Sequence, residues 1–204
     1  MKQIALIILI FFFSINSYGQ ASQDSTLLEK IIKEMAGGEN AAMVKNVPAG
    51  CWDKLGVIVK NGTWRAFRKY DKGHDIILTE KEKGNLLDQI KQNKPFKWSN
   101  KVLPRFIKIE ADSMESYFIS ENKRHDDLMK DALLNKDTAT FYKNKYVHPW
   151  VFTITKPVYF RDNSFCLINI IALCGTSCGR SEIAVYKMEE GNWMRWLVLE
   201  AGDY

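Results

Sequence analysis

The fold is decided by the stretch FCLINIIALCGTSCGRSEIAVYKMEEGNWMRWLVL, residues 165–199. Its first nine residues are apolar with one exception, which is typical of a strand covered on both faces. Beyond the CGTSCG loop, residues 182–188 and 193–199 alternate more, and Glu190-Gly191-Asn192 between them is a turn signal. Residues 150–160 precede the stretch and add one more strand candidate. We therefore expect a C-terminal four-strand antiparallel meander.

Helix signals lie in the first two thirds of the chain. Residues 26–29 have the spacing of a capping box and open a helix of about 24–36 with an apolar stripe. A second capping box, Thr79 to Glu82, begins a helix that Pro95 ends. Residues 126–134 predict a third helix, because their apolar side chains fall on one face.

Shorter strand signals occur between these helices. Asn61-Gly62 separates the apolar run GVIV from TWRAF and predicts a hairpin, because both residues of such a turn must accept positive φ. Residues 106–109 are a short strand candidate. The expected class is α+β: one domain, residues 20–204, in which two or three helices pack on one side of an antiparallel sheet.

The N-terminus has the pattern of a secretory signal peptide. Lys2 precedes the apolar run 4–13, and small or polar residues follow up to Gly19. The run is too short to cross a bilayer, which needs about 20 residues. We expect cleavage after Gly19, which removes residues 1–19 and exports the rest to the periplasm or the cell exterior. No later apolar segment is long enough to span a membrane.

The charge of the chain is mildly basic and well mixed. It has 29 Lys and Arg against 24 Asp and Glu, a formal net charge of +5. Because the basic residues form no long block, we expect a solvated surface and no nucleic-acid partner. No phosphate loop, dinucleotide fingerprint or HExxH motif occurs, and we expect no cofactor and no metal.

The CGTSCG loop, residues 174–179, invites three chemical interpretations that its context disfavours. Ser177 stands in a literal G-x-S-x-G, but a strand pattern follows it and all three histidines precede it, unlike a nucleophile elbow. A closed zinc site needs four Cys or His ligands, and only Cys174 and Cys178 are close in sequence. A thioredoxin-type pair is C-x-x-C at a helix N-terminus, whereas this is C-x-x-x-C in a hairpin loop.

A disulfide is the remaining interpretation, because an exported chain favours oxidised cysteines. Cys166 and Cys174 lie on one expected strand, roughly 26 Å apart at 3.3 Å per residue, and a disulfide requires Cα atoms within about 7 Å. Cys178 is equally far from Cys166. The only complete pairing is therefore Cys174–Cys178 with Cys51–Cys166. The alternative leaves Cys166 as a buried free thiol.

The C-terminal quarter of the chain also resembles a known pattern. Lys156-Pro157, the CGxxCG loop with Gly175 and Gly179, Tyr186-Lys187, Gly191 and Trp193 resemble the end of a loose group of small exported proteins of Gram-negative bacteria. The resemblance implies a structural role for the Cys-Gly loop and carries no activity with it.

Two tryptophans are the candidate binding surface. Trp193 and Trp196 have opposite parity on the last expected strand, so one should be buried and the other partly exposed. Exposed aromatic rings can stack on sugars or anchor a protein partner. We therefore expect a non-catalytic binding or structural domain of the cell envelope, with an unknown protein or glycan as its ligand.

An envelope enzyme is the competing hypothesis. It would be a thiol oxidoreductase that uses Cys174 and Cys178, or a hydrolase that uses His74-Asp75 or His125-Asp126. Neighbours in sequence rarely point at each other, and both pairs lie in polar stretches. His148 begins a strand, where packing is its ordinary role. We expect no catalytic residue.

Overall fold

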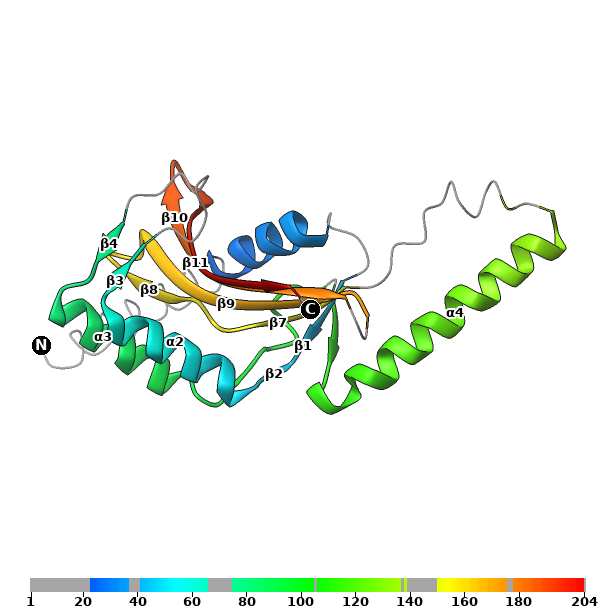
Figure 1. The fold of residues 1–204 in the computed structure, drawn as a ribbon, viewed down its shortest axis with the longest axis horizontal. Coiled ribbons are helices and arrows are strands. Elements are labelled where there is room, and N and C mark those ends of the chain that lie inside the picture. Colours follow the sequence, from blue (N-terminus) through cyan, green and yellow to red (C-terminus); the bar gives the residue numbers. More distant parts are fainter. Residues whose placement is uncertain are drawn as a thin grey trace, which may run out of the picture.

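The structure is a computed structural model that describes residues 23–36, 41–65, 75–104, 106–136, 138, 150–175 and 178–203. Figure 1 shows a long twisted sheet with helices on both faces and one helix that projects beyond its end. The expected α+β class and antiparallel-rich sheet are confirmed. The predicted signal peptide, His74, His148 and Ser177 lie outside the described residues.

The C-terminal strands form the predicted meander. Strands β7 and β8 both pair antiparallel with β9, and β9, β10 and β11 follow one another antiparallel. The bounds are β7 Trp150–Ile154, β8 Val158–Phe160, β9 Phe165–Leu173, β10 Gly179–Glu189 and β11 Asn192–Asp203.

The turns of the meander lie where the sequence predicts them. Asp162 and Asn163 have φ of 55° and 61°, and Glu190 and Gly191 have φ of 50° and 79°. Left-handed backbone at two central residues is what a tight hairpin requires to match the twist of its strands.

The far side of the sheet contains parallel strands, which the sequence did not predict. The order is β11-β10-β9-β7-β1-β6, and β1 (Ala41–Val44) pairs in parallel with β7 and with β6 (Ile107–Ile109). The sheet is therefore antiparallel through the predicted meander and parallel at β1, beyond it. All four side chains of β1 are buried, so this short strand shows no alternation that periodicity could detect.

Helices cover both faces of the sheet, which agrees with the expected cover on both faces of the central strand and corrects the expectation that the helices pack on one side. On one face, the hydroxyl of Tyr159 donates to Asp24 of the N-terminal helix (residues 23–36), and Tyr159 is the partner of Cys166 in β9. On the other, the side chain of Asn169 donates to the carbonyl of Cys51 in α2. Because alternate residues of a strand face opposite sides, β9 separates the two.

We call these sides the N-helix face and the α2/α3 face. In β9 the N-helix face consists of Cys166, Ile168, Ile170 and Ala172, and the α2/α3 face of Phe165, Leu167, Asn169, Ile171 and Leu173. Helices α2 (Ala49–Asn61) and α3 (Glu80–Gln92) lie together on the second face.

The predicted hairpin at Asn61-Gly62 is wrong. The run GVIVKN is the end of α2, and Gly62 is its left-handed C-cap with φ of 70°, donating its N–H to Val59. The positive φ that favours Gly in a hairpin turn favours it equally after a helix. The capping box from Thr79 to Glu82, by contrast, is formed as predicted and opens α3.

Two small strand pairs and the last helix complete the fold. β2 (Asn46–Val47) pairs with β5 (Phe96–Lys97), and β3 (Thr63–Trp64) pairs with β4 (Ile76–Ile77). A 3₁₀ turn, Ala111–Ser113, leads into α4, Met114–Leu134, which is longer than the predicted helix at 126–134.

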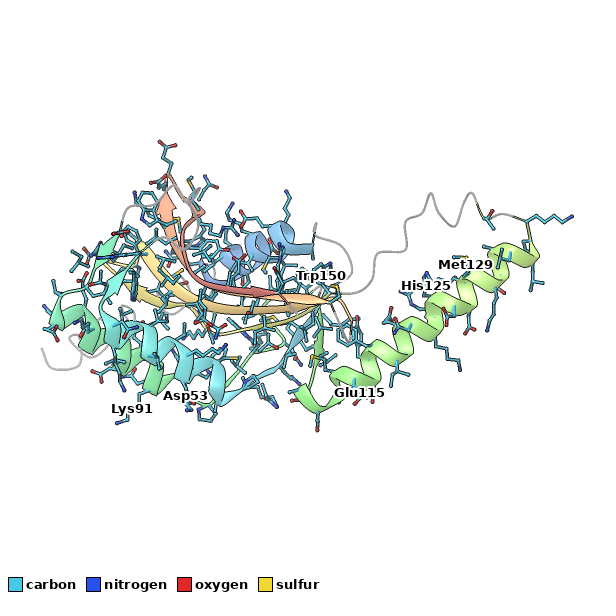
Figure 2. The ribbon with its side chains drawn as sticks, viewed as in Figure 1. Asp53, Lys91, Glu115, His125, Met129 and Trp150 are labelled. Atoms are coloured by element: carbon cyan, nitrogen blue, oxygen red, sulfur yellow. A yellow bond between two sulfur atoms is a disulfide. The ribbon has the colours of Figure 1, made fainter. Side chains whose placement is uncertain are left out.

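Helix α4 contacts the sheet only near its start. Phe118 is its buried residue and packs with Val44 and Val151, and the rest of the helix extends away from the sheet (Figure 2). No helix within the described part of the chain is both long enough and apolar enough to cross a membrane.

Candidate functional site

A cavity of about 500 Å³ opens on the α2/α3 face where the helices leave the sheet uncovered. Its floor is formed by Thr153 of β7 with Ile171 and Leu173 of β9. Its walls are the first two turns of α4, the disulfide loop and the residue before α2, namely Met114, Glu115, Phe118, Gly175, Cys178 and Pro48. A cavity of this size lies within the range of small-molecule sites.

The cavity arises because no helix crosses this end of the sheet. Helix α2 begins only after Pro48. The proline ring fixes the φ angle of this residue at a value that suits the entry to a helix. Helix α4 begins beside the sheet, contacts it through its first turns, around Met114 and Phe118, and then extends away from it. The floor residues Ile171 and Leu173 are consequently only half-buried, although they belong to the central strand.

Two polar side chains interrupt the apolar lining. Thr153 is 8% exposed, and its hydroxyl makes no hydrogen bond with any residue that the structure describes. Glu115 lies in the first turn of α4, beside the sheet (Figure 2), and is the charged residue among those that line the cavity. The cavity therefore offers an apolar body, the hydroxyl of a largely buried threonine and one carboxylate.

The disulfide predicted at the loop is present. Cys174 and Cys178 are bonded with their Cα atoms 5.3 Å apart, and the N–H of Cys174 donates to the carbonyl of Cys178 at 3.0 Å. The disulfide joins the end of β9 to the start of β10, so it fixes the loop that closes one side of the cavity. Sequence reasoning predicted this bond but not the cavity beside it.

The second predicted disulfide is not formed. Cys51 and Cys166 are both buried free thiols, which is the alternative that the sequence left open for Cys166. Cys166 belongs to the N-helix face of β9, while Cys51 lies in α2 on the other face. The sheet itself separates the two sulfur atoms. Burial raises the pKa of the Cys166 thiol well above its usual value, so it stays protonated and inert.

The two tryptophans behave as their parity predicts. Trp193 is 1% exposed and packs against Tyr159 on the N-helix face, with 5.9 Å between ring centroids. Trp196 is half-buried, and its ring centroid lies 6.3 Å from that of Phe165. The ammonium of Lys187 lies 4.4 Å from the centroid of the Trp196 ring. Trp193 is therefore removed from the candidate binding surface, and one face of the Trp196 ring is already occupied by a cation.

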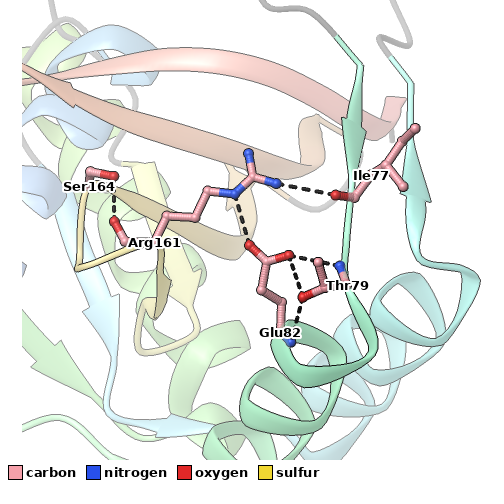
Figure 3. Close-up of polar contacts among 5 residues, drawn as sticks. All are labelled: Ile77, Thr79, Glu82, Arg161 and Ser164. Atoms are coloured by element: carbon pink, nitrogen blue, oxygen red, sulfur yellow. Dashed lines mark hydrogen bonds and ion pairs between the residues drawn. The ribbon is translucent and has the colours of Figure 1, made fainter.

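The end of the α2/α3 face near Trp196 is held closed by Arg161. Its guanidinium donates to Glu82 at 2.9 Å and to the carbonyl of Ile77 at 3.2 Å (Figure 3), and stacks over Phe160 and Phe165. Glu82 is also the third residue of α3 and forms the capping box with Thr79. Burial acts to raise the pKa of Glu82, but its hydrogen bonds with Thr79 and Arg161 outweigh this and lower the pKa. This contact fastens the β8–β9 turn to α3.

Of the two predicted His-Asp pairs, the structure describes both residues only of His125-Asp126. His125 lies in α4, far from the sheet (Figure 2), and its Nδ1 is 3.5 Å from Oδ1 of the neighbouring Asp126, at the limit of a hydrogen bond. No group of three His, Cys, Asp or Glu side chains in the described residues is arranged to hold a metal ion.

Comparison with protein-family models, with curated proteins and with solved structures found no match. The resemblance to small exported proteins with a CGxxCG hairpin therefore stays a prediction from the sequence.

Proposed function

We propose that the protein is a non-catalytic binding domain of the cell envelope and that its ligand enters the cavity beside the disulfide loop. The observation that carries this proposal is the lining of a cavity of about 500 Å³: apolar side chains on a floor of two central strands, with the hydroxyl of a largely buried threonine and one rim carboxylate. Such lining, with few polar groups, is typical of small-molecule sites.

The walls support binding rather than catalysis. The floor belongs to the rigid centre of the sheet, and a disulfide fixes one wall, so the site is largely formed before a ligand arrives. Thr153 and Glu115 are the groups able to hydrogen-bond through their side chains, and neither has a described partner that would activate it as a nucleophile or base.

The proposal is tested with a neutral apolar fluorophore, N-phenylnaphthylamine, excited outside the absorption band of tryptophan. The wild-type protein is expected to raise its emission with a stoichiometry of one. Ile171→Trp, which fills the cavity from its floor, is expected to abolish the rise. Ile77→Trp is the matched control, because Ile77 is 70% exposed in β4 and does not line the cavity. Equal emission from both variants would refute the proposed site.

A thiol oxidoreductase is the second candidate, because Cys178 lines the cavity and is exposed. A thiol substrate bound there could reach the disulfide. The hairpin context argues against it, since neither cysteine lies at a helix N-terminus, where the dipole stabilises a thiolate. Oxidation of a dithiol peptide to its disulfide, with the Cys174–Cys178 bond reduced to two thiols in the same step, would favour the enzyme if it occurs with the wild type and is lost in Cys178→Ser.

A further inference from the structure

We infer that the cavity selects small cationic amphiphiles: molecules with an apolar body, a protonated amine at one end and a hydroxyl or similar polar group at the other. This inference rests on the proposed function and assigns the chemistry of its ligand. Its basis is the placement of Thr153 on the floor and Glu115 on the rim of one apolar cavity.

Thr153 provides the inner polar contact. Its side chain is 8% exposed, on the floor of the cavity, and no described residue accepts or donates a hydrogen bond to its hydroxyl. The hydroxyl is not one of the fully buried side-chain atoms that lack a partner in the described residues, so it is reached by solvent at the cavity that Thr153 lines. A ligand hydroxyl or amide that reaches the floor would supply this partner.

Glu115 determines the sign of charge at the rim. It is exposed, it lines the cavity, and it has no ion pair or hydrogen bond with the described residues. Glu110 and Glu200, by contrast, already have cationic partners, Lys45 and Lys97 for the first and Lys54 for the second. A ligand ammonium group at the mouth of the cavity would form an ion pair with the carboxylate of Glu115, while a ligand carboxylate would be repelled by it.

The apolar walls provide the rest of the selectivity. Met114 and Phe118 on α4 face Ile171 and Leu173 on the sheet, so the body of the ligand passes between a helix and a strand. Met is flexible and fills irregular gaps, which suits an unbranched chain better than a rigid polar molecule such as a sugar.

Four decyl probes, used below their micelle concentrations, test the inference by isothermal titration: ω-aminodecanol, decylamine, decanol and decanoate. The expected order of affinity is ω-aminodecanol, then decylamine, then decanol, with decanoate weakest. Failure of all four to bind would refute the proposed function itself. Equal binding of all four would leave the binding site standing and refute the selectivity.

Two variants assign the contacts. Thr153→Val keeps the shape of the side chain. It is expected to weaken the binding of ω-aminodecanol by roughly fivefold, which corresponds to the loss of one hydrogen bond, and to leave the affinity for decylamine unchanged. Glu115→Gln is expected to weaken both amines by up to about fivefold, as for an exposed ion pair, and to leave decanol unchanged. Glu200→Gln is the matched control for net charge, since Glu200 is on β11 and does not line the cavity. An equal loss for all probes in either cavity variant would indicate a structural effect and overturn the assignment.

Discussion

The two faces of the sheet are built from the same strands but covered differently. On the N-helix face, one amphipathic helix buries Leu27, Leu28, Ile31 and Ile32 completely or nearly so, and even Asp24 is enclosed with Tyr159. On the α2/α3 face, two helices close one end and leave the other to the first turns of α4, where the cavity lies. On the first face even a polar group is enclosed, whereas on the second the incomplete cover leaves the cavity that we propose as a binding site.

The largest difference is expected when equivalent apolar side chains are shortened on the two faces. Ile31→Ala removes a fully buried side chain from the N-terminal helix and is expected to lower the free energy of unfolding by about 3 kcal/mol. Ile171→Ala, at a half-buried position beside an existing cavity, is expected to cost about 1 kcal/mol. Urea denaturation measures both, and similar losses would contradict the difference in cover.

The disulfide is expected to contribute the next largest effect. Replacing both Cys174 and Cys178 by Ser should lower the free energy of unfolding by about 2 kcal/mol, the chain-entropy value for so short a loop. The same double variant should bind N-phenylnaphthylamine more weakly, because the freed loop is a wall of the cavity. Reductant should shift the unfolding midpoint of the wild type and leave the double variant unchanged. A wild type insensitive to reductant would show that the bond is absent.

Asp24 gives the N-helix face a distinctive pH dependence. Burial raises its pKa above the ordinary value of 3.8, although the Tyr159 hydroxyl at 2.6 Å and the charge of Lys156 act in the opposite direction. A raised pKa in the folded state means that the protonated carboxyl stabilises fully below pH 3.8, and that this contribution is lost as the pH rises through the folded pKa.

Asp24→Asn keeps an acceptor for Tyr159 but does not ionise. The stability of this variant relative to the wild type should therefore increase as the pH rises from about 3.8 to neutrality. Thermal unfolding over this pH range measures the difference. A constant difference between the two proteins would mean that Asp24 titrates as it does in the unfolded chain.

The smallest effect expected concerns the tryptophans, which report the two faces separately. Acrylamide should quench the emission of Trp196 and not that of Trp193, because Trp193 is 1% exposed and Trp196 is half-buried. Trp196→Phe should therefore lower the quenchable fraction, whereas Trp193→Phe removes an emitter that acrylamide does not reach and should raise this fraction slightly. The opposite pattern would place the exposed indole on the N-helix face.

Local signals in the sequence predict most of the fold. Strand β9 has the predicted bounds, Phe165–Leu173. A strand that is buried on both faces is recognisable from its continuous apolar run alone, without knowledge of the strands that pair with it. The capping box at Thr79 also forms as predicted. The hairpin prediction at Asn61-Gly62 is wrong because a hairpin turn and a helix C-cap both favour a residue with positive φ. The same two residues are therefore compatible with either structure, and here Gly62 caps α2.

The cavity could not be predicted from the sequence. Its lining comes from Pro48, from the start of α4, from β7 and from the disulfide loop, segments that only the tertiary fold brings together. The parallel pairing of β1 with β7 is equally non-local. The signal available in sequence was the disulfide pair at 174 and 178, which marks one wall of the site but not the space beside it.

The most direct test of the proposed site is methyl NMR spectroscopy during titration with N-phenylnaphthylamine. Ile168, Ile170 and Ile171 belong to one strand, but only Ile171 lies on the floor of the cavity. The methyl signals of Ile171 and Leu173 are expected to shift, while those of Ile168 and Ile170 on the N-helix face stay in place. Shifts confined to Ile168 and Ile170, or no shift at any of the four residues, would contradict a binding site on the α2/α3 face.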